Sequence, residues 1–279
     1  MIEQFVDLDR FSLDDLDSQR GRSLVARCRD DLATSGMFSL ERFIRPEALK
    51  QCVADIEGRL NTESFTHRRT HNIYFDDGVT EIPPDHPALK RVETVNHTIC
   101  ADQISGSLVC RVYEWAPLAE FLALTLGKEH LFLMADPLAR VNVLAYREGE
   151  ALNWHFDRSE FTTTLLLQEP ESGGTFQYRR SLHSEDDPNY AGVADLISGA
   201  NPSIESLLLS PGTLNVFKGR YTAHRITPVV GNRNRIVSVF SFYDEPGVTF
   251  SDAERTGFYG RSETINHESP DVSVSNVQN

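Results

Sequence analysis

The spacing of the apolar residues changes once along this 279-residue chain, and the change limits the folds open to it. Up to about Gly127 apolar residues recur mostly at helical spacing, whereas later they form short runs with the two-residue period of strands. Turn sequences such as Glu171-Ser-Gly-Gly and Ser210-Pro-Gly separate these runs. The runs cover residues 131–134, 139–146, 161–167, 174–178, 206–209, 212–217 and 236–243. We therefore expect an α+β fold, a jelly roll with a helical layer on one sheet.

Three helical blocks are expected before the strands. The first opens on Ser12 as its cap, and the second begins at Arg45-Pro46-Glu47 with proline in its first turn. The third covers about 107–126, where Pro117 must kink the helix or restart it. Residues 37–44 are compatible with a short strand.

The chain shows no internal repeat and no second fold, so we expect one domain over residues 1–279. Within it, 1–127 would be mainly helical support and 128–245 the jelly-roll core. Residues 246–279 would form a C-terminal lid and, in their Ser/Asn/Glu-rich end, a mobile tail.

Charge and cysteine content limit the binding partners and the cellular compartment that we expect. Lys and Arg number 27 against 41 Asp and Glu, a net charge of −14 that disfavours nucleic-acid and anionic-membrane partners. The four cysteines form no CxxC pair and are typical of free thiols in a reducing compartment. The first residues do not resemble a signal peptide, and no apolar run could span a bilayer. We expect a cytoplasmic protein, and nothing in the sequence fixes its oligomeric state.

A histidine followed two residues later by an acid occurs twice. Composition alone gives each of the nine histidines a roughly 15% chance of such a pair, so about one is expected. His183 and Glu185 lie in a polar loop, where solvated side chains are the natural interpretation. His155 and Asp157 lie between two strand-like runs, where an extended segment points both side chains to one face.

A third candidate ligand follows much later in the chain. His224 comes after the strand-like run 212–217 and can approach the earlier pair from a distant strand of a jelly roll. Two histidines and a carboxylate without cysteine suit Fe(II) or a similar divalent ion better than structural zinc. For His224 alone, a hydrogen-bonded core histidine remains the alternative.

Arg235 lies eleven residues after His224 and leads into the apolar run 236–243. A buried arginine needs an anion, and its planar fork suits the carboxylate of a cosubstrate beside a metal. Arg233 shares its parity and is the second candidate, and a solvated rim arginine is the alternative for either residue.

With these residues in view, the chain resembles the Fe(II)/2-oxoglutarate-dependent oxygenases, whose fold is a double-stranded β-helix. The matching segments, in order, are Tyr146…Gly149…Leu152-Asn-Trp-His155-Phe-Asp157, Gly173-Gly174-Thr-Phe, Pro211-Gly-Thr-Leu-Asn-Val-Phe217, His224-Arg-Ile-Thr-Pro-Val229 and Arg235. The resemblance implies that His155, Asp157 and His224 bind iron. It also implies that Arg235 binds the distal carboxylate of 2-oxoglutarate, and that Tyr146 lines the same pocket or is a core aromatic.

A narrower resemblance involves a bacterial group that contains radical halogenases and hydroxylases of free amino acids. It rests on the segment from Trp154 to Phe161, on Phe242-Tyr243-Asp-Glu-Pro-Gly247 and on Gly257-Phe-Tyr259-Gly-Arg261. In the halogenases of this group glycine replaces the acid and leaves room for chloride. Asp157 fills that place here, so the resemblance implies hydroxylation. A cationic Arg158 would repel an ammonium, which argues against lysine as substrate.

The function expected from the sequence is hydroxylation of an unactivated C–H bond by Fe(II), 2-oxoglutarate and O2. The substrate would be a small molecule, a free amino acid or a derivative. Candidate substrate contacts are Arg158, His71, Asn72, Tyr74 and Tyr259. Solvent exposure is the alternative for Arg158, and loop packing is the alternative for the other four.

Three other classes of protein remain open. The first is a peptidyl, prolyl-type hydroxylase that acts on a protein. The second is a non-catalytic, cupin-like metal binder, which would not need Arg235. The third is a structural protein in which the three candidate ligands are accidental polar residues.

Overall fold

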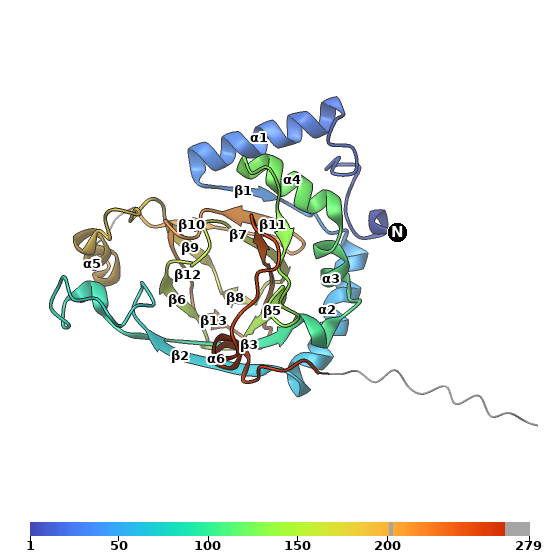
Figure 1. Cartoon of the computed structure of the whole chain (residues 1–279). Helices are drawn as coiled ribbons and strands as arrows, with labels where there is room; N and C mark the ends of the chain where they lie inside the picture. The colour runs from blue at the N-terminus through green and yellow to red at the C-terminus, as the bar shows by residue number, and fades with distance from the viewer. Residues whose placement is uncertain (201–202, 266–279) are drawn as a thin grey trace, which may run out of the picture.

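The computed structural model describes residues 1–200 and 203–265, which form two large β-sheets, two short two-stranded sheets and a helical layer (Figure 1). The strands are β1 Met37–Leu40, β2 Phe65–His71, β3 Val92–Cys100, β4 Phe132–Leu133, β5 Val141–Tyr146, β6 Leu152–His155, β7 Thr162–Gln168, β8 Ser172–Gly173, β9 Phe176–Arg179, β10 Glu205–Leu207, β11 Leu214–Phe217, β12 Ala223–Ile226, β13 Val229–Val230, β14 Arg235–Phe240 and β15 Phe242–Tyr243. The α-helices are α1 Gln19–Ser35, α2 Pro46–Thr62, α3 Leu108–Tyr113, α4 Ala116–Leu126, α5 Tyr190–Ser198 and α6 Asp252–Tyr259, and short 3-10 helices cover Ile2–Gln4, Pro87–Leu89 and Ala101–Ile104.

The larger sheet has seven antiparallel strands in the order β1-β11-β7-β14-β5-β3-β2. A four-stranded sheet in the order β10-β9-β12-β6 lies against its inner face. Aromatic and aliphatic side chains of β9 and β12 pack on Met37 and Phe217 of the larger sheet, so the two sheets share a core. This is the predicted α+β jelly-roll class, which the structure confirms.

Residues of one strand alternate between the two faces of the larger sheet. In β5, Val141, Val143 and Ala145 pack into the main core, whereas Asn142, Leu144 and Tyr146 face the space between the sheets. This alternation follows from the two-residue period of a strand. The outer face of the sheet is therefore apolar, and the inner face is free to carry polar groups.

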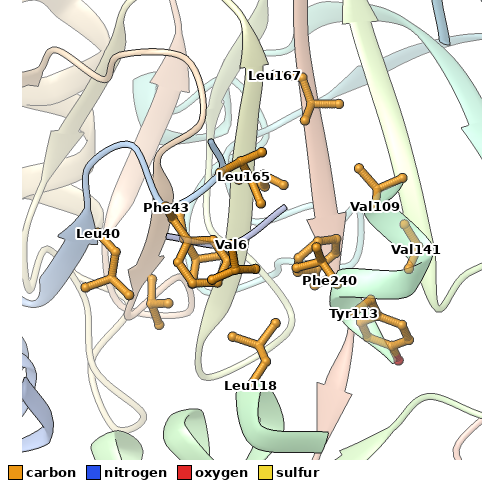
Figure 2. Close-up of a cluster of buried hydrophobic side chains, with 14 of the residues drawn as sticks. Val6, Leu40, Phe43, Val109, Tyr113, Leu118, Val141, Leu165, Leu167 and Phe240 are labelled. Atoms are coloured by element: carbon orange, nitrogen blue, oxygen red, sulfur yellow. The ribbon is translucent and has the colours of Figure 1, made fainter. Parts of the chain in front are cut away.

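Helices α1 to α4 cover the outer face of the larger sheet (Figure 1). Figure 2 shows Leu165, Val141 and Phe240 from three neighbouring strands meeting Tyr113 of α3 and Leu118 of α4. All of these side chains are nearly or fully inaccessible to water. At about 25 cal/mol per Å² of apolar surface removed from water, such a core is the main source of stability.

The helices begin and end largely where sequence signals place them. Pro46 opens α2, and the third block divides into α3 and α4 at Trp115, two residues before Pro117. The first helix differs from expectation, because its cap is Ser18, whose hydroxyl accepts a hydrogen bond from the Gly21 amide, and not Ser12. No helix in the described part of the chain is long and apolar enough to cross a membrane.

The first 127 residues contribute more sheet than the sequence suggests. Besides helices, they provide β1, β2 and β3, three of the seven strands in the larger sheet. Helices α5 and α6 were also not expected from the apolar spacing. Residues 252–259 of the proposed C-terminal lid form α6, and the predicted mobile tail from 266 onward lies outside the described residues.

Candidate metal centre

Two histidines from different strands lie opposite each other between the sheets. His155 ends β6, His224 lies in β12, and the antiparallel pairing aligns the two residues directly. Their ring centroids are 4.1 Å apart, and both side chains are buried. Asp157 follows β6, and one ligand atom from each of the three residues lies within 4.8 Å of the others. The strand pairing thus brings together residues about 70 positions apart in sequence.

Hydrogen bonds fix the orientation of both imidazoles. Nδ1 of His155 contacts the Asn153 carbonyl at 2.8 Å, and Nδ1 of His224 contacts the Thr222 carbonyl at 2.9 Å. Because a carbonyl only accepts, each Nδ1 carries the proton and each neutral ring keeps a lone pair on Nε2. Both Nε2 atoms point toward Asp157. Metal-binding histidines have the same arrangement, in which the ring nitrogen that does not bind the metal donates a hydrogen bond to a carbonyl or carboxylate.

The carboxylate of Asp157 lies between the two rings. Its Oδ1 is 3.4 Å from Nε2 of His155, and its Oδ2 is 3.4 Å from Nε2 of His224. The Thr162 hydroxyl donates a hydrogen bond to Oδ2, and the Asp157 amide donates to the Gly219 carbonyl at 3.1 Å. Burial alone would raise the pKa of Asp157, but the two imidazoles outweigh it and hold this pKa well below its usual range.

The donor set fits a single divalent ion. Ligands each about 2.1 Å from one ion lie at most about 4.2 Å apart, and the two nitrogen–oxygen separations satisfy this limit. Two imidazoles and one carboxylate are the ligands of the facial triad, which leaves further coordination positions open on a non-haem iron. Within the described residues no other group of three such side chains converges in this way.

Arg235 begins β14 and is buried beside this site. Its Nε donates a hydrogen bond to the Gly174 carbonyl at 3.0 Å, whereas its Nη1 is buried and has no partner among the described residues. Burial lowers the pKa of Arg235 to about 10, so the group stays charged at neutral pH. A buried cation with an unpaired donor is unfavourable by itself, which points to an anionic ligand.

The other two residues expected around a cosubstrate lie in different environments. Arg233 is exposed and donates to the Pro170 carbonyl, so it lacks the buried, unpaired donor of Arg235. Tyr146 is buried, pairs with Arg235 across β5 and β14, and lines the cavity next to the metal residues. Burial raises the pKa of Tyr146 to about 12.

A cavity of about 300 Å³ adjoins His155 and Asp157 between the sheets. Three of the five candidate substrate contacts line it, namely His71, Arg158 and Tyr259. Asn72 and Tyr74 do not. The Asn72 side chain closes a turn by accepting from the Tyr74 and Asp76 amides, and the Tyr74 hydroxyl donates to the Pro188 carbonyl. These two residues stabilise the loop after β2, and their contact with a substrate stays a prediction.

Each of the three lining residues already has a partner. Nδ1 of His71 contacts the Asn72 carbonyl and its Nε2 contacts the Thr94 hydroxyl, while Tyr259 donates to Asn142. Arg158 is exposed and forms an ion pair with Glu254 of α6 at 2.9 Å. His183, of the other His-X-acid pair, contacts the Ser184 carbonyl in its own loop through Nδ1 and the Arg220 carbonyl of a distant segment through Nε2.

The site also contains residues that sequence reasoning missed. Thr94, Asn96 and Thr98 of β3 line the cavity, as does Asn142 of β5. Asn142 could have been found, since it lies four residues before Tyr146 in one strand and therefore faces the same side of the sheet. Nothing in the local sequence of β3 marks it as a cavity wall.

The family comparison identifies the chain over most of its length. A family model described as HalD, Halogenase D, matches residues 21–253. A comparison with curated proteins finds no match.

Several solved structures are similar in fold. The epimerase SnoN from nogalamycin biosynthesis superposes with a TM-score of 0.56 at 13% identity, over 80% of this chain and 84% of that chain. A prolyl hydroxylase from Trichoplax adhaerens, in complex with a hypoxia inducible factor peptide, gives 0.51 at 12% over 80% and 90%. HygX from Streptomyces hygroscopicus, solved with nickel and 2-oxoglutarate, gives 0.51 at 12% over 77% and 85%.

Identities this low establish a shared fold, the jelly roll seen here, and leave the substrate open. The family match rests on the sequence itself and spans both strands that carry the three candidate ligands. The chain therefore belongs to the Halogenase D family.

Proposed function

We propose that this protein is an Fe(II)- and 2-oxoglutarate-dependent oxygenase that hydroxylates an unactivated C–H bond of a small molecule, an amino acid or an amino-acid derivative. The convergence of His155, Asp157 and His224 beside a buried, unpaired Arg235 is the observation that carries the proposal. Family membership and the fold shared with SnoN and HygX agree with it.

Each residue has a role that its surroundings support. His155, Asp157 and His224 would hold the iron, and Arg235 would bind the distal carboxylate of 2-oxoglutarate with Tyr146 beside it. Iron bound with 2-oxoglutarate and O2 would supply the oxidising power, with succinate and carbon dioxide as the products of 2-oxoglutarate. The protein then needs only to position the substrate carbon and exclude water, which a cavity between two sheets does.

Hydroxylation is preferred over halogenation because Asp157 is present. Its carboxylate lies within 3.4 Å of both imidazoles, where it would occupy the coordination position that a halide needs. Halogenation is the second candidate function, favoured by the description of the family. The two functions differ in their product, so they can be separated directly.

The test is anaerobic loading with Fe(II) and 2-oxoglutarate, followed by exposure to O2 with and without chloride. We expect succinate formation in both cases and a product heavier than its substrate by one oxygen atom. His224→Ala should abolish succinate formation, whereas a chlorinated product from the natural protein would favour halogenation. Absence of any 2-oxoglutarate turnover in the metal-loaded protein would contradict the proposal and favour a cupin-like metal binder.

A cytoplasmic location is part of the proposal. Cys28, Cys52, Cys100 and Cys110 are all free and buried, as expected in a reducing compartment. Such an environment also keeps iron in the ferrous state that the proposed chemistry requires.

A further inference from the structure

We propose that the substrate is an apolar carboxylic acid without a free ammonium group, such as an N-acylated amino acid, and that Arg69 binds its carboxylate. This inference rests on the proposed function and names the class of molecule that the cavity accepts. Three observations carry it: the side chains that β2 turns toward the cavity, the charges on the cavity wall and its aromatic lining.

Strand β2 presents a cationic side chain to the cavity. Its residues alternate in exposure, and His67, Arg69 and His71 line the cavity whereas Arg68 and Thr70 are exposed. Arg69 is half-buried, and its guanidinium carbon lies 4.8 Å from the centroid of the Phe75 ring. That ring lies 5.7 Å from the ring of His155, so one aromatic side chain separates Arg69 from the metal ligands.

Arg69 is the one charged cavity residue without a charged partner in the described part of the chain. Arg158 is paired with Glu254, and Asp157 lies between the two imidazoles. No carboxylate lies within 4.0 Å of the Arg69 guanidinium, and no side-chain hydrogen bond holds it among the described residues. An arginine fork in this state is suited to a ligand carboxylate, which it can bind through two N–H groups.

Among the described residues, the same wall offers no free carboxylate to pair with an ammonium. Asp157, a candidate metal ligand, is the only acid among the described residues that line the cavity. The amide oxygens of Asn96 and Asn142 already accept from the Thr98 and Tyr259 hydroxyls. A buried ammonium without a counter-charge is costly, and Arg69 and Arg158 would add repulsion.

Much of the remaining lining is aromatic or aliphatic. The rings of Phe75, Phe161, Phe242, Phe250 and Phe258 all contribute to the wall, together with Leu144. Three of these rings come from the segment that includes α6, which therefore completes the cavity from the C-terminal side. This wall therefore complements a ligand that places an anionic end at Arg69 and an aliphatic or aromatic body along these rings.

The experiment compares matched probes for binding and turnover. N-acetyl-L-leucine carries only the carboxylate, L-leucine adds the ammonium, N-acetyl-L-leucine amide carries neither charge, and 4-methylpentanoate lacks the nitrogen. The corresponding four phenylalanine compounds extend the test to a larger body. Affinity for the anaerobic protein loaded with Fe(II) and 2-oxoglutarate is measured by calorimetry, and succinate release on adding O2 gives turnover.

Two variants of neighbouring arginines show whether a change in binding comes from the lost charge or from a disturbed fold. Arg69→Gln removes the cation and keeps most of the aliphatic stem. Arg68→Gln is the matched control, because Arg68 is the adjacent residue, points away from the cavity and pairs with Glu93 on the surface. Melting temperature confirms that both variants are folded.

The expected result is that the acylated or deaminated acids bind roughly tenfold to a hundredfold more tightly than the amides, as one charge-assisted pair would give. Arg69→Gln should erase that difference, with no change for the amides, and Arg68→Gln should preserve it. Equal or tighter binding of the free amino acids would overturn the inference. So would an unchanged acid preference in Arg69→Gln, which would mean that Arg69 is merely solvated.

Failure of the inference is distinguishable from failure of the proposed function. Iron-dependent 2-oxoglutarate turnover without added substrate reports on the metal residues and Arg235 alone. If that turnover is present and none of the eight probes binds, the substrate class is wrong while the oxygenase assignment stands.

Discussion

At the scale of single residues, one glycine controls the position of the metal carboxylate. A Cβ atom added at Gly219 would lie 2.3 Å from Oδ2 of Asp157 and 2.5 Å from the Thr162 hydroxyl oxygen. Contacts below 3.0 Å force something to move, and here the mobile partner is the proposed iron ligand. The absence of a side chain at 219 is therefore as necessary to the site as the ligands themselves.

We predict that Gly219→Ala weakens metal binding at least tenfold, because Asp157 must leave the position between the imidazoles. Calorimetric titration with Ni(II), a redox-inactive substitute, measures the loss. Gly58→Ala is the control, since a Cβ there meets nothing within 4 Å on the exposed side of α2. That variant should keep full affinity and gain stability of about 0.5–1 kcal/mol from helix propensity. Unchanged metal affinity in Gly219→Ala would contradict the role assigned to Asp157.

Variants of Arg235 and Arg233 test which arginine binds 2-oxoglutarate. Arg235→Gln should weaken 2-oxoglutarate binding by roughly tenfold to a hundredfold, the effect of losing charged hydrogen bonds to a carboxylate. Arg233→Gln should have no effect, because that side chain is exposed and contacts only the Pro170 carbonyl. Binding of 2-oxoglutarate to the nickel-loaded protein measures both. The opposite ranking of the two variants would place the cosubstrate elsewhere.

At the scale of elements, strands β2 and β3 at one end of the larger sheet explain why part of the fold was not evident from the sequence. Strand β3 buries Thr94, Asn96 and Thr98 on the cavity side, and β2 turns two histidines and an arginine the same way. Apart from Phe65, β2 has polar residues on both faces, and His97 interrupts the apolar face of β3, so the alternation of apolar and polar residues is absent from β2 and incomplete in β3. Where a face lines a polar site, the pattern that marks a half-buried strand is absent for a functional reason.

A buried carboxylate, Asp136, helps to hold the C-terminal segment to the jelly roll. Asp136 is fully buried and accepts from the amides of Leu138, Ala139 and Phe250 and from Nε of Arg255 in α6. Burial alone would raise the pKa of Asp136, but the Ala139 amide and the Arg255 guanidinium outweigh it and lower the pKa below its usual value.

Asp136→Asn should destabilise the protein by about 3–5 kcal/mol, the effect of breaking a buried ion pair, and should expose α6 to hydrogen exchange. Asp252→Asn is the control, since Asp252 contacts the same arginine at 3.7 Å from the solvent-exposed surface. Because the pKa of Asp136 is lowered in the folded state, its contribution is present above the unfolded pKa. It is lost as the pH falls through the folded value, so acid should remove the difference between Asp136→Asn and the natural protein. Protection of α6 that is identical in both variants would contradict this account.

The outer face of the larger sheet carries the stability of the fold. Leu165 is completely buried at the centre of that core, between strands and helices (Figure 2). Leu165→Ala should reduce the free energy of unfolding by about 2–5 kcal/mol, through lost burial and the cavity left behind. Leu208→Ala, at a side chain that is 83% exposed, should change it by less than about 0.5 kcal/mol. Denaturant unfolding of the two variants provides the comparison.

At the scale of the whole molecule, metal binding should couple to stability. A divalent ion that binds only the folded state at a hundred times its Kd stabilises it by about 2.7 kcal/mol, which corresponds to several degrees in Tm. Ni(II) should therefore raise the Tm of the natural protein, and a chelator should reverse the effect. His224→Ala should lose the shift, whereas His183→Ala should keep it, because His183 contacts only loop carbonyls and neighbouring rings. A shift that survives in His224→Ala would place the metal elsewhere.

The sequence by itself determined the class of fold, the start of α2, the break between α3 and α4, and the candidate ligands. These features depend on local information: the period of apolar residues, proline at a helix start, and the chemistry of histidine and aspartate between strand-like runs. Tertiary structure alone decided that β6 and β12 align His155 with His224, that Arg235 is buried and Arg233 exposed, and that β2 and β3 close the cavity. Strand order and register join residues far apart in the chain, and spacing along the sequence carries no record of which strands pair.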